Sequence, residues 1–142
     1  MGHIDLDTSV GYLLKQAATA LRSAMDGALR PLGMTVSQYS CLEVLAHRPG
    51  ISNSELARAT FVSRQSMNVM LQALQSDGWV TRPDQAPSGR VLPVQLTPLG
   101  RERLDAASSA VRDVELRMHS GLSPADQSRL RTLLAECIGA LS

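Results

Sequence analysis

The stretch ISNSELARATFVSRQSMNVMLQALQSDGW, residues 51–79, decides the fold of this chain. Ser52 precedes Glu55 by three positions, a spacing typical of a capped helix start, and a second start follows at Ser63. From Ser63 to Asp77 apolar residues recur every three or four positions, which predicts one buried helical stripe. The stretch therefore predicts two short helices joined by a turn, a helix-turn-helix.

The face of this second helix opposite the apolar stripe is polar. It combines hydroxyls, amides and a single guanidinium, and we expect DNA contacts from Ser63, Arg64, Gln65, Ser66, Asn68 and Gln72. Amide and guanidinium groups hydrogen-bond base edges in the major groove, while a helix N-terminus attracts phosphate. A solvated surface helix has a similar pattern, so the elements that follow decide between the two interpretations.

Two strands are predicted after the second helix, at residues 79–82 and 91–96, with a turn-rich loop between them. Pro93 has no N–H for a strand ladder, which is typical of an edge strand such as a two-stranded wing provides. Arg82 and Arg90 stand at the two bases of the loop, and we expect both to contact DNA. For Arg82 a phosphate contact or a structural salt bridge fits the position equally.

Three runs, in this order, resemble signatures of the MarR family of bacterial transcriptional regulators: Ser54-Glu55-Leu56-Ala57, Leu74-Gln75-Ser76-Asp77-Gly78-Trp79-Val80 and Val94-Gln95-Leu96-Thr97-Pro98-Leu99-Gly100. The resemblance covers nearly the whole chain. It implies a single domain over residues 1–142, mainly α with a small β wing. Within it, the resemblance implies a winged helix-turn-helix head at 35–96 and dimerisation helices at 8–30 and 98–142.

The resemblance also assigns roles to single residues. Arg90 aligns with the arginine that enters the minor groove in this family, while Ser88 and Gly89 replace the usual neighbours of that arginine. Family members often have a basic residue at the positions of Val69 and Gln72, and this chain has none there. We therefore expect base contacts from the N-terminal part of the recognition helix.

Long apolar stripes are predicted on both sides of the head. They run from Val10 to Leu29 and from Leu130 to Leu141, and they exceed what a small head can bury. One recognition helix reads few base pairs, whereas two linked heads about one helical turn apart read a palindrome with roughly the sum of both binding energies. We therefore expect a homodimer on a palindromic operator in double-stranded DNA.

The composition is that of an ordinary globular protein. Of its 142 residues 44% are hydrophobic and 19% charged, and the net charge is +1. The basic excess lies in the centre, where residues 48–103 contain seven arginines and four carboxylates. The sequence has no apolar run long enough to span a bilayer and no signal-peptide pattern, so we expect a cytoplasmic protein without membrane contact.

The sequence holds no recognisable pattern for catalysis or metal binding. The two cysteines and three histidines lack the spacing of metal ligands. We find no pairing of a nucleophile with a base and no glycine-rich loop that would hold a phosphate. We therefore expect a protein that is not an enzyme and that needs no metal or cofactor.

A small-molecule effector is implied by the resemblance, because ligand sites in this family lie between the dimer helices and the head. Tyr12, Tyr39 and His47 are the candidate pocket residues, for a small aromatic or phenolic compound that releases a repressor from DNA. Two alternatives stay open: a winged-helix module that binds protein and has weak or lost DNA binding, and a regulator that senses redox state through Cys41 or Cys137. Both cysteines fall among apolar residues, which favours a packing role.

Overall fold

The computed structural model describes residues 2–82 and 93–142, which form helices and one small sheet. The elements are α1 (Val10–Leu29), η1 (Arg30–Leu32), α2 (Val36–His47), α3 (Asn53–Ala59), α4 (Arg64–Ser76), β1 (Val80–Thr81), β2 (Gln95–Leu96), α5 (Pro98–Met118) and α6 (Pro124–Leu141). The predicted fold class, mainly α with a small β wing, is confirmed. The predicted helix-turn-helix corresponds to α3 and α4.

Each α-helix begins after a serine or threonine whose side chain accepts a hydrogen bond from a backbone N–H of the first turn. These N-caps are Ser9, Thr35, Ser52, Ser63, Thr97 and Ser123. Such a cap satisfies one of the N–H groups that a helix start leaves unpaired and contributes about 1 kcal/mol. At the start of α2, Thr35 and Gln38 form a complete capping box.

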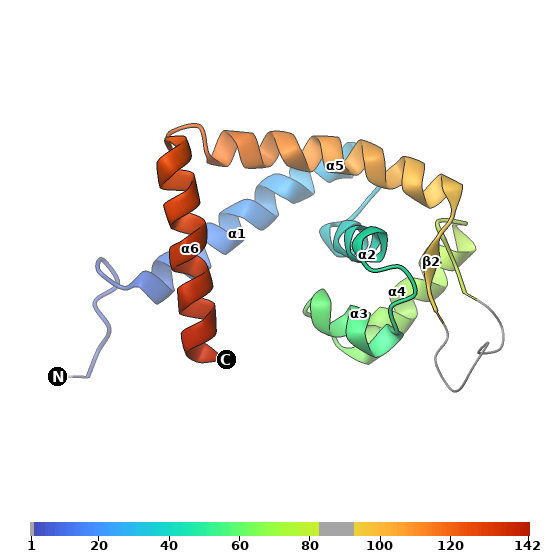
Figure 1. Ribbon diagram of the computed structural model, residues 1–142, viewed down its shortest axis with the longest axis horizontal. Coiled ribbons are helices and arrows are strands. Elements are labelled where there is room, and N and C mark those ends of the chain that lie inside the picture. Colours follow the sequence, from blue (N-terminus) through green and yellow to red (C-terminus); the bar gives the residue numbers. More distant parts are fainter. Residues whose placement is uncertain (1, 83–92) are drawn as a thin grey trace.

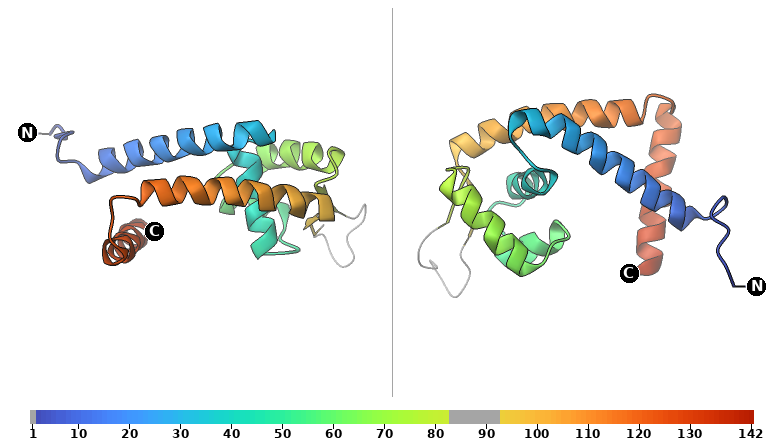
Figure 2. Two further views of the ribbon diagram at one scale, coloured as in Figure 1. Left: turned by 90° about the horizontal axis from the view of Figure 1, so that it is seen from above. Right: turned by 180° about the vertical axis from the view of Figure 1, so that it is seen from behind.

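The C-terminal half of α1 packs against α5, and its N-terminal half diverges from α5 (Figure 1; Figure 2, right). We call this pair of helices the beam. The head, made of α2, α3, α4 and the two strands, packs against one end of this beam. Helix α6 turns away at the other end of α5 and stands apart from the head in all three views (Figures 1 and 2). The beam therefore connects the head to α6, which belongs to the region predicted for dimerisation.

The core joins every element of the head to the end of α1 and to α5 as far as Val111. Its most deeply buried large side chains are Leu29, Leu42, Leu45, Leu56, Met67, Leu71, Leu74 and Val94. Burial of one such side chain stabilises the fold by about 1.5–3 kcal/mol. The stripe predicted on α4 is confirmed, since Met67, Leu71 and Leu74 are buried and Met70 packs partly buried beside them.

The wing, residues 79–96, is described only at its base. Strands β1 and β2 pair antiparallel, with Val80 opposite Leu96 and Thr81 opposite Gln95. The predicted strands, at 79–82 and 91–96, were too long, because Trp79, Arg82, Pro93 and Val94 lie outside the paired residues. Residues 83–92 lie outside the described part of the chain. The prediction for Arg90 falls on these residues.

Helix α6 has no buried residue in the single chain. Its apolar positions Leu130, Leu133, Ile138 and Leu141 are all exposed. Exposed apolar patches of this kind mark surfaces that associate with another molecule. None of the helices in the described residues has the length and apolar content needed to cross a membrane.

Candidate nucleic-acid interface

The outward face of α4 is centred on Gln65, Val69 and Gln72. At 100° per residue these positions point away from the buried stripe, and all three are exposed. Arg64 and Asn68 are also exposed, but they lie on the flank of the helix that faces α3. Of the predicted DNA-contacting residues, Gln65 and Gln72 therefore lie in a central row and Arg64 and Asn68 in a flanking row, while Ser63 and Ser66 lie at the helix N-terminus.

Hydrogen bonds to α3 orient the flanking row. The Arg64 Nη1 donates to Ser54 Oγ at 3.2 Å, and the Asn53 Nδ2 donates to Asn68 Oδ1. With its oxygen already bonded, Asn68 presents its own NH₂ group, which donates to a purine N7 or a carbonyl oxygen in the major groove. This hydrogen bond holds Asn68 against α3 while its side chain stays exposed.

The N-terminus of α4 is arranged to accept an anion. Ser63 Oγ accepts from Ser66 N at 3.0 Å and also donates to Ser66 Oγ at 3.0 Å. The hydroxyl groups of Ser63 and Ser66 are thus hydrogen-bonded to each other. Within the described chain, the backbone N–H groups of Arg64 and Gln65 remain for an oxygen of a phosphate.

Phe61 is an exposed residue of the turn between α3 and α4 that sequence reasoning did not single out. Its side chain is 94% exposed, and its φ of 62° makes it the one non-glycine residue with positive φ in residues 2–82 and 93–142. A left-handed conformation is costly for a residue with a Cβ. Nothing in the local sequence pattern signals this conformation.

At the wing, Arg82 is partly buried directly after β1. The described residues show no ion pair for its guanidinium, so the salt bridge considered for it receives no support there. A position at the base of the wing suits a phosphate contact.

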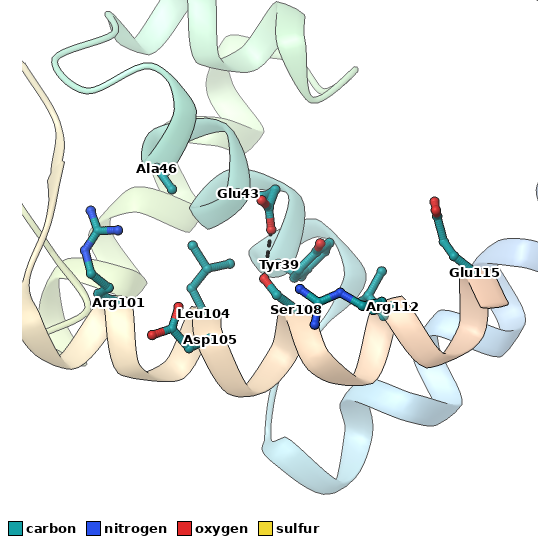
Figure 3. Close-up of a pocket in the computed structure, with 10 residues that line it drawn as sticks. Tyr39, Glu43, Ala46, Arg101, Leu104, Asp105, Ser108, Arg112 and Glu115 are labelled. Atoms are coloured by element: carbon teal, nitrogen blue, oxygen red, sulfur yellow. Dashed lines mark hydrogen bonds between the residues drawn. The ribbon is translucent and has the colours of Figure 1, made fainter. Parts of the chain in front are cut away.

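A cavity of about 510 Å³ lies between α2 and α5 (Figure 3). Its polar lining consists of Tyr39 and Glu43 from α2 and Arg101, Asp105, Ser108, Arg112 and Glu115 from α5. Ser108 Oγ donates to Glu43 Oε2 at 3.0 Å, which links the head to the beam across the cavity. Burial and the neighbouring Glu43 carboxylate raise the pKa of Tyr39 to about 12, so its phenol stays protonated at neutral pH.

The three residues predicted for an effector pocket do not line one cavity of the single chain. Tyr39 lines the cavity between α2 and α5, whereas Tyr12 lines a separate depression on α1. His47 is exposed at the end of α2, with its Nδ1 2.9 Å from the carbonyl oxygen of Glu43. Sequence reasoning missed Ser108 and the rest of the α5 wall, because nothing local marks residues that meet only through tertiary packing.

The two cysteines differ in their surroundings. Cys41 is fully buried, and its Sγ donates to Met67 Sδ at 4.0 Å. Burial raises the pKa of the Cys41 thiol to about 12, which removes the reactive thiolate at neutral pH. Cys137 is exposed on α6. Cys41 therefore has the environment of a packing residue.

Comparison with known proteins agrees with this arrangement. Residues 32–90 match the model of the MarR family. The chain is 39% identical over 134 residues to the HTH-type transcriptional repressor Rv2887 of Mycobacterium tuberculosis, covering 94% of this chain and 96% of that protein. The solved complex of Rv2887 with DNA has a TM-score of 0.78 at 35% identity, covering 92% of this chain and 98% of that one.

Two further solved structures are similar. The complex of Rv2887 with salicylic acid has a TM-score of 0.75 at 37% identity and covers 92% of this chain and 97% of that one. The transcriptional repressor CouR bound to a 23-mer DNA duplex has a TM-score of 0.85 at 27% identity, and the match covers 96% of this chain and 99% of that one.

Proposed function

Because the chain belongs to the MarR family of transcriptional regulators, we propose that it represses transcription by placing α4 in the major groove of a palindromic operator. The observation that carries this proposal is the outward face of α4, whose polar side chains are exposed and partly oriented by α3. In this proposal the protein acts by binding, in the cytoplasm, and catalyses no reaction.

The proposed contacts divide into base contacts and phosphate contacts. Gln65, Asn68 and Gln72 would bond base edges, because their side chains are uncharged donors and acceptors on the outward surface. The N-terminus of α4, at Ser63 to Ser66, and Arg82 would bind phosphates. We propose that Arg90 contacts the minor groove, as the resemblance to the MarR family implies.

Two chains would form the DNA-binding unit. The exposed apolar side chains of α6, together with Val10 and Leu13 of α1, gain about 25 cal/mol for each Å² that a second chain covers. Light scattering at micromolar concentration should report the mass of two chains. Ile138→Asp, which places a carboxylate on this surface, should shift the mass toward one chain, whereas Arg82→Gln on the head should leave it unchanged. A monomeric parent protein would contradict the proposal.

The cavity between α2 and α5 is the proposed effector site. Solved structures of Rv2887 contain salicylic acid and p-aminosalicylic acid, which are small aromatic acids. In this chain the Arg112 guanidinium offers a partner for a carboxylate, and the protonated Tyr39 phenol offers a hydrogen-bond donor. A ligand seated there would compete with the Ser108 to Glu43 hydrogen bond that joins the beam to the head.

The DNA-binding proposal is tested by fluorescence anisotropy on the promoter DNA beside the coding sequence. Counterion release lowers log Kobs by about 0.9 per phosphate contact for each unit of log salt, so binding should weaken steeply between low and physiological salt. The alternative, a winged helix that binds protein through an apolar surface, predicts little salt dependence and no selectivity for the promoter. Equal affinity for promoter and random DNA would contradict the proposal.

The effector proposal is tested with salicylate as the probe. Salicylate should release the parent protein from the duplex, and Arg112→Gln should raise the concentration needed for release. Arg129→Gln, which changes an exposed arginine of α6 outside the cavity, is the matched control and should behave like the parent. If Arg112→Gln responds like the control, the cavity is not the site.

A further inference from the structure

The centre of the outward face of α4 is an apolar side chain. Val69 is 64% exposed, and it lies opposite the buried Met67, Leu71 and Leu74. Gln65 stands four residues before it and Gln72 three residues after it, so two amides flank Val69 along the helix. This surface therefore presents a methyl pair between two hydrogen-bonding groups.

Folding does not account for a valine at this position. A β-branched residue is a weaker helix former than alanine, lysine or glutamine, and the exposed methyl groups of Val69 stay in contact with water. The side chain is absent from the core, and the described parts of the chain leave most of its surface uncovered. Its methyl groups are available for a partner that approaches α4.

The major groove offers one apolar group, the C5 methyl of thymine. A glutamine amide matches the N6 and N7 atoms of adenine, so A·T pairs satisfy both kinds of side chain on this surface. At about 1.5 Å of rise per residue, Gln65 and Gln72 lie about 6 Å and 4.5 Å along the helix axis from Val69, within roughly two base-pair steps. The three side chains can therefore read neighbouring base pairs.

The same helix has few side chains suited to hydrogen bonds with guanine. Arg64 is the sole charged side chain of α4, and it lies on the flank, where it donates to Ser54 Oγ. Resting on the proposed function, we infer that Val69 packs against a thymine methyl group in the major groove and so fixes an A·T pair at the centre of each half-site. Gln65 and Gln72 read the pairs beside it.

The test starts with the full-length parent protein and a random-sequence duplex library, from which bound DNA is selected and sequenced. Each conserved thymine of the selected duplex is then replaced by deoxyuridine, which removes only the C5 methyl group. Affinities are measured by anisotropy for the parent, Val69→Ala and Gln65→Ala. Thermal melting of the variants checks folding, which a change at an exposed helix position should leave intact.

For the parent, deoxyuridine at one thymine per half-site should weaken binding about fourfold for each methyl group removed, the equivalent of about 0.8 kcal/mol. Val69→Ala should bind the thymine duplex more weakly than the parent and should bind thymine and uracil duplexes equally at that position. Gln65→Ala is the matched control on the same face, and it should keep the difference between thymine and uracil.

Two results would overturn the inference while DNA binding stands. One is a parent whose affinity is unchanged by deoxyuridine at every conserved thymine. The other is a Val69→Ala protein that keeps the full difference between thymine and uracil. A selection that enriches no duplex would overturn the inference together with the proposed function, so the two failures are distinguishable.

Discussion

Gly100→Ala should destabilise the protein strongly, because this glycine lies directly against a backbone carbonyl. A Cβ at Gly100 would stand 1.9 Å from the oxygen and 2.9 Å from the carbonyl carbon of Trp79. Real Cβ contacts essentially never fall below 3.0 Å, so the two backbone segments would have to separate by more than 1 Å. Neither side of this contact is a flexible side chain that can turn away.

The expected loss in the free energy of unfolding follows from the contacts that this separation breaks. Overpacking of a core costs about 1–3 kcal/mol, and the Trp79 carbonyl also accepts a hydrogen bond from Thr97 N at 3.1 Å, whose loss adds about 1 kcal/mol. We expect the free energy of unfolding to fall by about 3 kcal/mol, a large share of the total for a domain of this size. Because Trp79 precedes β1, the wing should lose its support and DNA affinity should fall as well.

Gly27→Ala is the matched control. This exposed glycine lies inside α1, and a Cβ there would meet nothing within 4 Å. The same substitution should therefore stabilise the protein by about 0.5–1 kcal/mol, because alanine favours a helix over glycine. Urea unfolding of both variants and the parent at one protein concentration gives the comparison. A loss of less than 1 kcal/mol for Gly100→Ala would refute the close-contact argument.

Three further predictions concern the head and the thiols. Asn68→Ala should reduce the difference in binding free energy between operator and random DNA by about 1–3 kcal/mol and leave the salt dependence of binding unchanged. Arg64→Ala should lower the slope of log Kobs against log salt by about one if Arg64 neutralises a phosphate. The same change in both quantities for the two variants would contradict their separate roles. Phe61→Gly should raise the free energy of unfolding by about 0.5–1 kcal/mol, measured in urea, because glycine adopts positive φ without penalty; a loss of stability would show that the exposed ring packs in the native state. With Ellman's reagent at pH 8, Cys41, buried in the head and protonated below a pKa of about 12, should react only on unfolding; a rapid reaction of both thiols in the native protein would contradict the burial of Cys41.

The helices and the head were predictable from the sequence because their signals are local. The hydroxyl of Ser52 or Ser63 stands next to the N–H groups that it caps, and the α4 stripe repeats within one helix. Gly78, which has a positive φ of 78°, depends on an equally local signal, since a left-handed residue just past a helix end favours glycine. Each of these features depends on residues within a few positions of one another.

The contacts that orient the reading side chains were not predictable in this way. Asn53 and Ser54 look like ordinary first-turn residues of α3, and only the packing of α3 on α4 brings them to Asn68 and Arg64. The α5 wall of the cavity was missed because Ser108 meets Glu43 across 65 positions of chain. Helical periodicity reports which face is buried, but it does not report which residue of another helix lies opposite.

Helix α5 contacts or leads to the three regions with a proposed function: the DNA-binding wing, the effector cavity and the dimerisation helix α6. Its first turn touches the wing base through Gly100 and Trp79, its middle lines the effector cavity, and its last turn leads to α6. Ser108 lies eight residues, about 12 Å, from Gly100 on one continuous helix, so a ligand that displaces the middle of α5 also displaces its first turn. Because the contact at Gly100 joins backbone atoms to backbone atoms, no flexible side chain lies between α5 and Trp79 that could change its rotamer and leave β1 in place. An effector in the cavity would therefore act on the wing directly, in addition to any change in the spacing of two recognition helices.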